Sequence, residues 1–545
     1  MAEGGLRQKG GGNRKQMKIP TVDLFAGPGG LGEGFAAYKG RMQFDLVLSV
    51  DKDPAACRTL ELRHFFRQFG QRQIPDEYYA YVKGEVTREH LLKAFPDKFR
   101  SASKAVWQAE LGREPLQNVL HRIRRVLGNS RYWVLLGGPP CQAYSFAGRA
   151  RMKGMENYGK DERHTLYQEY LKIVAALQPT VFVMENVKGI LSSRYQDERI
   201  FARILRDMRD PWVAISDADR RETPRPPIAQ RYRLWSFSRT ALLDNALNPG
   251  DYVIEAENYL IPQTRHRVII FGIREDYSVI PPVLEKANGK VTVRDVLAGL
   301  PKIRSRLSGG ETDNSGWARS IREGMEGLCL NIHPDVGVRI REVLRALPES
   351  LDTGGRFIPG GGVPGRLEEW LCDSRIGGTL QHEARAHMVS DLHRYLYAAC
   401  YAEVRGRFPR IDEFPAILRP RHRNVKKDGR TEDFRDRFRV QLWDEVAGTI
   451  TSHICKDGHY YIHPDPFQCR SLTVREAARL QTFPDNYFFE GFRTDQYRQV
   501  GNAVPPFLAF QMADIVAEVL EACMEQDTGR SPTANVRYIA GYRHG

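Results

Sequence analysis

The chain has few of the features that mark metal-binding, secreted or membrane proteins. Its 8 cysteines are scattered and form no Cys-x-x-Cys pair, which argues against a zinc ribbon or a disulfide framework and favours a reducing cytosol. Residues 1–18 are rich in Gly, Lys and Arg without an apolar core, so we predict neither a signal peptide nor an anchor there. No run approaches the roughly 20 apolar residues of a membrane span.

Positive charge is what the chain has in excess. Its 545 residues include 81 Lys and Arg against 67 Asp and Glu, for a formal net charge of +14. Such a basic balance favours a polyanionic partner. The length is enough for two domains, or for one elaborated domain with a large core.

A glycine-rich turn follows the first strand-like segment. Residues 21–25 are typical of a buried strand, and residues 26–32 (AGPGGLG) form a turn that leads into a helix. Glycines let a ligand approach the backbone closely, and a helix N-terminus favours an anionic group. A second strand, residues 46–50, ends at Asp51, where a carboxylate can bind ribose hydroxyls. On these elements alone, an NAD-dependent oxidoreductase fits about equally well.

Two further segments supply a thiol and a carboxylic acid. Cys141 stands in a Gly-Gly-Pro-Pro-Cys-Gln turn after the apolar residues 133–136, and Glu185 follows the apolar residues 181–184. A cysteine in such a turn is partly exposed, with backbone N–H groups nearby that favour its nucleophilic thiolate. An unpaired cysteine is usually a small buried residue. The turn alone therefore does not identify Cys141 as a nucleophile, and other motifs must support that role.

Together these segments resemble the cytosine carbon-5 DNA methyltransferase family, of the prokaryotic type associated with restriction-modification or phage defence. The likeness runs in chain order from Asp23 to a helix that starts near Pro505, and it includes six separate motifs. The motifs are residues 23–30 (DLFAGPGG), 139–142 (PPCQ), 161–166 (DERHTL), 185–187 (ENV), 263–267 (QTRHR) and 501–506 (GNAVPP).

The resemblance implies the cofactor S-adenosyl-L-methionine. Phe25 is expected to stack on its adenine, and Asp51 is expected to bind its ribose. Glu85 stands where the family usually offers an aspartate to the adenine amino group, and we expect residues 81–86 to form the third strand and its loop. The other expected cofactor contacts are Gly27, Gly29, Gly30, Pro140, Leu166 and Asn502.

The resemblance also implies the chemistry. Carbon 5 of cytosine is a poor nucleophile until a covalent adduct at carbon 6 converts the ring into an enamine, and we predict that Cys141 forms that adduct. Glu185 is expected to reach ring nitrogen 3 as the acid. The two arginines of the QTRHR motif, Arg265 and Arg267, alternate on a strand and are expected to help hold the base and the catalytic loop. The reaction needs no metal.

The alternation of strands and helices in the N-terminal half predicts an α/β fold. We expect the Rossmann-like, doubly wound sheet of S-adenosylmethionine-dependent methyltransferases, with a second, smaller target-recognition domain. Apolar residues at helical spacing predict helices over 116–127 and 166–177. Thr473 and Glu476 form a capping box that opens another helix.

The domain boundaries follow from these elements and from changes in composition. Residues 143–160, with three glycines and several basic residues, suit a mobile lid over the target base, and basic residues within 419–439 suit phosphate contacts. The expected units are a flexible basic arm at 1–17, a catalytic domain at 18–279, a recognition domain at 280–490, a return to the catalytic domain at 491–525 and a frayed tail at 526–545.

The expected partner is double-stranded DNA, bound by a monomer with the target cytosine flipped out of the helix. His382 and His387 resemble metal ligands, but their five-residue separation places them about 140° apart on a helix, so we predict no metal site. We also expect no membrane contact, a cytoplasmic and nucleoid-associated location, and a companion restriction or defence nuclease.

Three alternatives stay open. A transfer RNA cytosine methyltransferase shares this chemistry, although the Cys-Phe-Thr element typical of that branch is missing here. An NAD-dependent oxidoreductase explains the glycine turn but leaves Cys141 and Glu185 without a role. A DNA-binding regulator with an inactive site conflicts with the presence of both residues.

Overall fold

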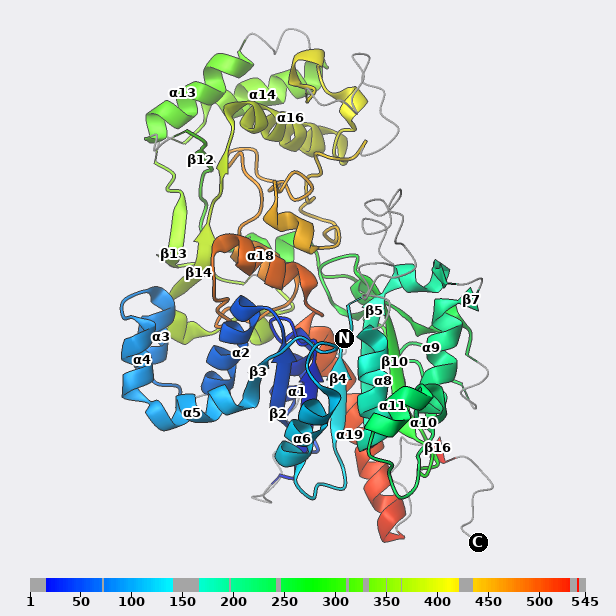
Figure 1. The fold of residues 1–545 in the computed structure, drawn as a ribbon. Coiled ribbons are helices and arrows are strands. Elements are labelled where there is room, and N and C mark those ends of the chain that lie inside the picture. The colour runs from blue at the N-terminus through cyan, green and yellow to red at the C-terminus, as the bar shows by residue number, and fades with distance from the viewer. Residues whose placement is uncertain are drawn as a thin grey trace, which may run out of the picture.

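The protein is described by a computed structural model in which a sheet-based lower body carries a second body above it (Figure 1). The structure describes residues 16–70, 73–140, 166–195, 198–241, 247–309, 313–326, 333–348, 350–363, 365–420, 435–529 and 537–538. The expected lid at 143–160 lies outside these residues, as do Cys141 and residues 1–15 of the expected arm at 1–17.

The lower body is built on an eight-stranded mixed sheet. Its strands are β1 (Lys18–Leu24), β2 (Gln43–Asp51), β3 (Val106–Gln108), β4 (Val134–Gly137), β5 (Val181–Val187), β8 (Tyr232–Trp235), β9 (Val253–Glu255) and β10 (His266–Arg274). They follow the order β3-β2-β1-β4-β5-β10-β8, and β9 also pairs with β10. The first five run parallel, whereas β10 is antiparallel to its neighbours. The order reverses between β1 and β4, where open α/β sheets bind ligands.

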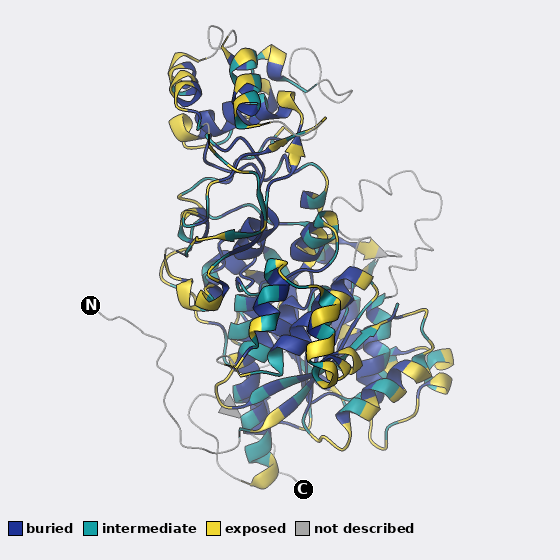
Figure 2. Ribbon diagram, turned by 90° about the vertical axis from the view of Figure 1, so that its left-hand side faces the viewer, coloured by how far each residue is buried: buried dark blue, intermediate teal, exposed yellow. Residues whose placement is uncertain are grey.

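Helices cover both faces of this sheet, which confirms the doubly wound prediction. Helices α1 (Gly30–Ala37) and α19 (Pro506–Thr528) share one apolar core with the sheet. Helices α6 (Leu116–Leu127), α8 (Leu166–Leu177) and α9 (Ile200–Arg209) share the core on the other face. The two helices predicted at 116–127 and 166–177 are therefore confirmed, and the strands are among the most buried parts of the molecule (Figure 2).

The prediction of a third strand at residues 81–86 is wrong. Residues 76–83 form helix α3 (Asp76–Lys83), whose buried residues Tyr78, Tyr79, Tyr81 and Val82 follow the spacing of a helix face. Glu85 comes after this helix and is exposed. The strand next to β2 is β3, which lies beyond an insertion made of α3, α4 (Arg88–Ala94) and α5 (Pro96–Ala105) after helix α2 (Pro54–Arg67).

The second body has a central layer of strands and a lobe of helices at its far end (Figure 1). In the central layer β13 (Gly354–Pro359) pairs with β14 (Gly378–Glu383), and β12 (Arg306–Leu307) pairs with β15 (Ala386–His387). The lobe consists of α13 (Asn314–Met325), α14 (Pro334–Arg345) and α16 (Val389–Arg405), which have an apolar core of their own.

A further apolar core lies where the second body meets the lower one. It joins residues 291–300 to helices α17 (Val474–Leu480) and α18 (Arg493–Asn502). Helix α17 begins with the predicted capping box: the Thr473 hydroxyl accepts from Glu476 N, and the Glu476 carboxylate accepts from Thr473 N at 2.7 Å. The chain then continues through α18 into α19 and so returns to the sheet.

Short elements complete the chain. The remaining helices are α10 (Pro211–Ala214), α11 (Asp217–Glu222), α12 (Val293–Leu297) and α15 (Glu368–Leu371). Single 3-10 turns are η3 (Lys188–Ser192), η5 (Pro249–Tyr252), η6 (Ala256–Tyr259), η8 (Ser374–Ile376), η9 (Ile411–Glu413), η10 (Ala416–Leu418) and η11 (Ser452–Cys455). The remaining strands are β6 (Arg194–Tyr195), β7 (Glu198–Arg199), β11 (Val279–Ile280) and β16 (Arg537–Tyr538).

The C-terminal region is more ordered than the sequence predicts. Helix α19 continues to Thr528, and β16 pairs with β11, so the expectation of a frayed tail from residue 526 is wrong for these residues. The stretch Arg493–Thr528, which inspection of the sequence does not single out, is long and apolar enough to cross a membrane by length and composition alone. Because 72% of its most apolar window is buried inside the protein, we interpret it as part of the core.

Candidate active site

The turn after β1 is held at the carboxyl end of the sheet by the end of β2. Gly27 N donates to Asp51 Oδ2 at 2.8 Å, and Asp53 N donates to Asp51 Oδ1 at 2.8 Å. Phe25 is half-buried and has a φ of 55°, which is uncommon for a residue with a side chain. Strained backbone of this kind clusters at ligand sites, and Phe25 and Asp51 therefore lie where the sequence places a cofactor.

The three glycines of this turn, Gly27, Gly29 and Gly30, differ in the space beside them. A Cβ on Gly27 would find no atom within 4 Å, so this residue faces open space. A Cβ on Gly29 would lie 2.7 Å from Leu60 Cδ2, and one on Gly30 would lie 2.1 Å from Val504 O. Gly29 and Gly30 are therefore required by packing within the protein, and their expected contact with the cofactor stays a prediction.

The Pro-Pro turn after β4 lies beside the glutamate motif at the end of β5. Gly138 N donates to Leu24 O at 3.3 Å, and Asn186 Nδ2 donates to Pro139 O at 3.4 Å. A Cβ on Gly138 would lie 3.3 Å from Glu185 Oε2. Pro140 is the last residue described before the gap, and Cys141 lies outside the described residues. The turn that leads to Cys141 is therefore in contact with the candidate acid.

Glu185 is paired with Arg267. Strand β10 runs antiparallel to β5 and brings Arg267 Nε to 3.0 Å from Glu185 Oε1. Both side chains are largely buried, with exposed fractions of 14% for Glu185 and 15% for Arg267. The guanidinium can therefore orient the carboxyl group and balance charge when a base is held there.

Arg265 occupies a different environment from Arg267. It precedes β10, and its guanidinium donates to Ile450 O at 2.7 Å and to Gly501 O at 3.4 Å. Burial, and then the neighbouring Arg267, lower the pKa of Arg265. Arg265 therefore links the start of β10 to the second body and to the end of α18, whereas Arg267 pairs with Glu185.

Two other predicted cofactor residues lie near the same edge. Asn502 is the exposed last residue of α18, and the next two residues, Ala503 and Val504, pack against Gly30. Leu166 begins α8, with its Cδ2 atom 3.5 Å from the position of a Cβ on Gly112. Gly112 lies in the loop that follows β3, so Leu166 contacts the loop after the strand that borders Asp51.

Glu85 follows helix α3 and is exposed, and the residues that border Asp51 are instead those at the end of β3 and just after it. Gln108, the last residue of β3, is paired with Asp51 in the sheet, and Ala109 N donates to Asp51 O at 2.9 Å. Glu110 follows at once and pairs with Lys52 at 3.0 Å. Sequence reasoning missed these residues because β3 is only three residues long and carries no alternating pattern.

Two carboxylates below and beside the turn have shifted pKa values. Burial raises the pKa of Asp51, against the effect of the hydrogen bonds from Asp53 N and Gly27 N. Burial raises the pKa of Asp23 to about 7, although Arg67 acts to lower it. Among the described residues, neither oxygen of the buried Asp23 carboxyl group has a hydrogen-bond partner at normal distance and angle. The strand that leads into the cofactor turn thus contains a carboxyl group that titrates near neutral pH.

The two histidines that resemble metal ligands form hydrogen bonds with other side chains of the protein. His382 Nδ1 contacts Thr473 Oγ1 at 2.9 Å, and His387 Nε2 contacts Ser471 Oγ at 3.2 Å. They lie on β14 and β15, so the helix assumed for their separation is wrong. Over the described ranges, no three or more His, Cys, Asp and Glu residues are grouped to hold a metal ion.

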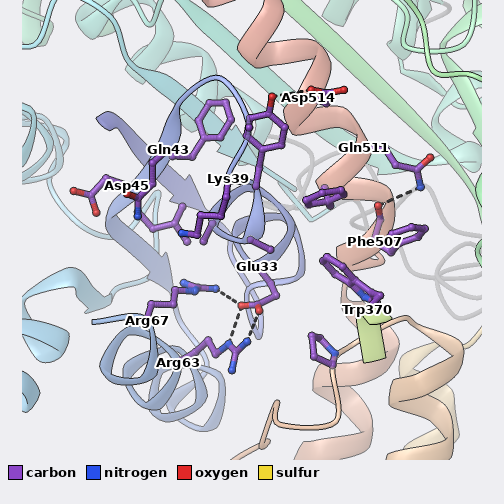
Figure 3. Close-up of a pocket in the computed structure, with 18 of the residues that line it drawn as sticks. Glu33, Lys39, Gln43, Asp45, Arg63, Arg67, Trp370, Phe507, Gln511 and Asp514 are labelled. Atoms are coloured by element: carbon purple, nitrogen blue, oxygen red, sulfur yellow. Dashed lines mark hydrogen bonds and ion pairs between the residues drawn. The ribbon is translucent and has the colours of Figure 1, made fainter. Parts of the chain in front are cut away.

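A large groove of about 3060 Å³ lies elsewhere on the molecule. It is lined by α1, the start of β2, α2 and α19, with Trp370 and Phe507 on one side and Glu33, Arg63 and Arg67 on the other (Figure 3). Of the predicted catalytic and cofactor residues, none lines it. The candidate site is therefore the edge of the sheet between β1 and β4 and not this groove.

Comparison with known proteins identifies the same family as the sequence motifs, over most of the chain. The family model of C-5 cytosine-specific DNA methylase matches residues 101–211 and 379–518. A type II methyltransferase of Bacillus paralicheniformis is 31% identical over 521 residues, which cover 92% of this chain and 99% of that protein. A type II methyltransferase of Thalassovita gelatinovora is 26% identical, with 91% of this chain and 99% of that protein covered.

Among solved structures, one match is described as a proposed DNA modification methyltransferase encoded within a prophage of E. coli. It is 18% identical, with a TM-score of 0.47, and the match covers 92% of this chain and 99% of that chain.

Proposed function

Because the chain belongs to the C-5 cytosine-specific DNA methylase family, we propose that it transfers a methyl group from S-adenosyl-L-methionine to carbon 5 of a cytosine flipped out of a specific duplex site. Membership of the family makes it a DNA cytosine-5 methyltransferase of the type II restriction-modification kind. The NAD-dependent oxidoreductase is therefore wrong, and DNA is favoured over transfer RNA as the substrate.

One observation carries this proposal: the glutamate motif, the Pro-Pro turn and the glycine turn meet at one edge of the sheet. Glu185 lies beside Gly138, and Gly138 in turn is bonded to the end of β1, from which the glycine turn begins. A methyl acceptor and a methyl donor must approach within bonding distance of each other. Adjacent strands at the reversal point of the sheet provide that arrangement.

The residues of the glycine turn fit the proposed cofactor. Open space beside Gly27 admits a ligand next to the backbone, the Asp51 carboxyl group is placed to bind hydroxyl groups, and Phe25 presents a half-buried ring. Asn502 and Leu166 border the same edge. When bound there, S-adenosyl-L-methionine supplies an electrophilic methyl group on its sulfonium.

In the proposed mechanism Cys141 supplies the nucleophile and Glu185 the proton. The thiolate of Cys141 bonds to carbon 6 of the cytosine while the electron pair moves toward nitrogen 3, which Glu185 protonates or holds by a hydrogen bond. Carbon 5, now part of an enamine, would accept the methyl group, and the donor would leave as the neutral thioether S-adenosyl-L-homocysteine. Loss of the carbon 5 proton to solvent then expels the Cys141 thiolate from carbon 6, and nitrogen 3 returns its proton to Glu185. Arg267 keeps the Glu185 carboxyl oriented throughout.

The substrate geometry requires the target base to leave the duplex. A thiol at the edge of the sheet cannot reach carbon 6 inside stacked DNA, so the base is flipped out at a cost of a few kcal/mol. The net charge of +14 supports phosphate contacts that offset this cost. We propose that the chain acts as a monomer on DNA, in the cytoplasm at the nucleoid, beside a companion restriction or defence nuclease.

The function is tested by replacing the proposed nucleophile. Cys141→Ala is expected to abolish 5-methylcytosine in host DNA, because the variant lacks the thiol that forms the carbon 6 adduct. Bisulfite sequencing of DNA from cells that express each form measures this and also reveals the target sequence. The exposed Cys372 provides a matched control, and Cys372→Ala should leave methylation unchanged. Methylation that persists in Cys141→Ala, or a wild-type protein that methylates RNA and not duplex DNA, would refute the proposal.

A further inference from the structure

The backbone conformation of the glycine turn after β1 depends on contacts from other segments of the chain. Phe25, Gly27 and Gly29 have φ values of 55°, 55° and 90°. Gly27 and Gly29 adopt such values readily, whereas the left-handed conformation of Phe25 persists only where surrounding contacts over-determine it. Within the turn, Gly29 N donates to Ala26 O at 2.9 Å. Further support has to come from other segments of the chain.

Tyr487 supplies such support from a segment that follows α17. Its hydroxyl donates to Pro28 O, and its side chain has an exposed fraction of 0%. The same hydroxyl lies 3.3 Å from the position of a Cβ on Gly29. Burial raises the pKa of Tyr487, so the hydroxyl keeps its proton and remains a donor at neutral pH.

Tyr487 is itself fixed to the second body. Its carbonyl oxygen accepts from Arg475 Nη2 at 2.8 Å, and Arg475 Nε donates to Leu380 O of β14 at 3.0 Å. The tyrosine ring packs against those of Phe483 and Phe489, with centroids 4.7 and 5.3 Å away. The position of the Tyr487 hydroxyl is therefore set by α17 and β14.

The lower body also contacts the Tyr487 ring. The Arg63 guanidinium lies 4.9 Å from the centroid of the Tyr487 ring. Arg63 and Arg67 both pair with Glu33 of α1, the helix that the turn leads into (Figure 3). Although burial alone would raise the pKa of Glu33, Arg63 and Arg67 lower it to about 2. The ion pairs therefore persist at neutral pH and fix α1 relative to Tyr487.

We propose that Tyr487 is a positioning residue for the cofactor. Through its hydroxyl, the second body holds the Pro28 carbonyl and keeps the turn in the conformation that receives S-adenosyl-L-methionine. The inference rests on the proposed function. Under this inference the second body contributes to cofactor binding, whereas the sequence assigns it to DNA recognition alone.

The test removes only the hydroxyl, with Tyr487→Phe in the full chain. Tyr497→Phe is the matched control, because Tyr497 is 1% exposed and its hydroxyl also donates to a buried carbonyl, Leu472 O, at 2.7 Å. Calorimetry measures the Kd of S-adenosyl-L-methionine and of S-adenosyl-L-homocysteine. One lost hydrogen bond predicts a Kd about three- to tenfold higher for Tyr487→Phe and less than about twofold higher for Tyr497→Phe.

A second measurement needs no ligand. Hydrogen exchange of the peptide that spans residues 26–30 reports the order of the turn directly. We expect faster exchange in Tyr487→Phe and wild-type exchange in Tyr497→Phe. A merely structural role for Tyr487 would instead raise exchange across the whole second body in Tyr487→Phe.

The outcomes separate this inference from the proposed function. A Kd and an exchange rate that are unchanged in Tyr487→Phe overturn the inference alone. An equal loss of affinity in both tyrosine variants also overturns it, because general loosening of the second body then explains the result. A wild-type protein that binds neither compound overturns the proposed function, and the inference fails with it.

Discussion

At the scale of single residues, the candidate site depends on side chains that are held by other segments. Glu185 is oriented by Arg267 from the neighbouring strand, and Arg265 is held by carbonyl groups of the second body and of α18. The sequence motifs identify these residues by type and spacing. They do not show which carbonyl groups hold Arg265, because these belong to segments 185 and 236 positions away along the chain.

Asp23 gives a prediction at this scale. Burial raises its pKa to about 7 in the folded protein from an ordinary value of 3.8. Between these values the folded state binds more protons than the unfolded state, so the contribution of Asp23 to stability falls as pH rises. In Asp23→Asn this dependence disappears. We expect the free energy of unfolding of the variant, relative to wild type, to rise by about 2 to 3 kcal/mol between pH 5 and pH 7.5.

Urea denaturation of both proteins at the two pH values measures this difference. Because the other titrating groups are common to the two proteins, their effects largely cancel in the comparison. A difference that stays constant with pH, or that moves in favour of the wild type, would contradict the raised pKa.

At the scale of elements, the strands and helices that carry an apolar pattern form where the sequence predicts them. Helices α6 and α8 agree with the predicted spacing, and α17 begins at its capping box. Strand β3 was not predicted, because three residues are too few to establish a period. Residues 81–86 have strand-like composition, but a buried helix face gives the same short apolar run, so tertiary packing decided between them.

The glycine turn gives a prediction at this scale. Gly27→Ala places a methyl group in open space at a φ of 55°, so it should cost only about 1 kcal/mol of stability while weakening cofactor binding. Gly30→Ala drives a methyl group to 2.1 Å from Val504 O and should destabilise the fold by more than about 2 kcal/mol.

Thermal unfolding and calorimetric titration with S-adenosyl-L-homocysteine distinguish the two variants. The expected pattern is a stable Gly27→Ala protein with weak binding and an unstable Gly30→Ala protein. If Gly30→Ala unfolds at the wild-type temperature, the contact between the glycine turn and the segment after α18 is wrong.

At the scale of the whole molecule, the lower body is closed by the last long helix of the chain. Helix α19 packs on α1 and on the sheet, and its residues Met512, Val516 and Leu520 are each 0% exposed. The second body is therefore inserted between the sheet and the helix that completes it.

A truncation tests this arrangement. Residues 1–490 lack α18 and α19 and should fail to fold cooperatively, because one face of the sheet loses its apolar cover. Residues 1–529 keep both helices and should unfold within a few degrees of the full chain. Circular dichroism with heating compares the two fragments. Cooperative unfolding of the 1–490 fragment would show that the sheet does not need α19.

The sequence by itself determined the chemistry and the class of fold. The six motifs identify the family, and alternating apolar segments predict a doubly wound sheet, because residue type and local spacing are enough to specify strands, helices and the turns between them. Tertiary structure alone decided which strand borders Asp51, that Gly29 and Gly30 serve packing, and that Tyr487 reaches the turn. Those contacts join residues up to 459 positions apart, and a separation of that kind leaves no local pattern in the sequence.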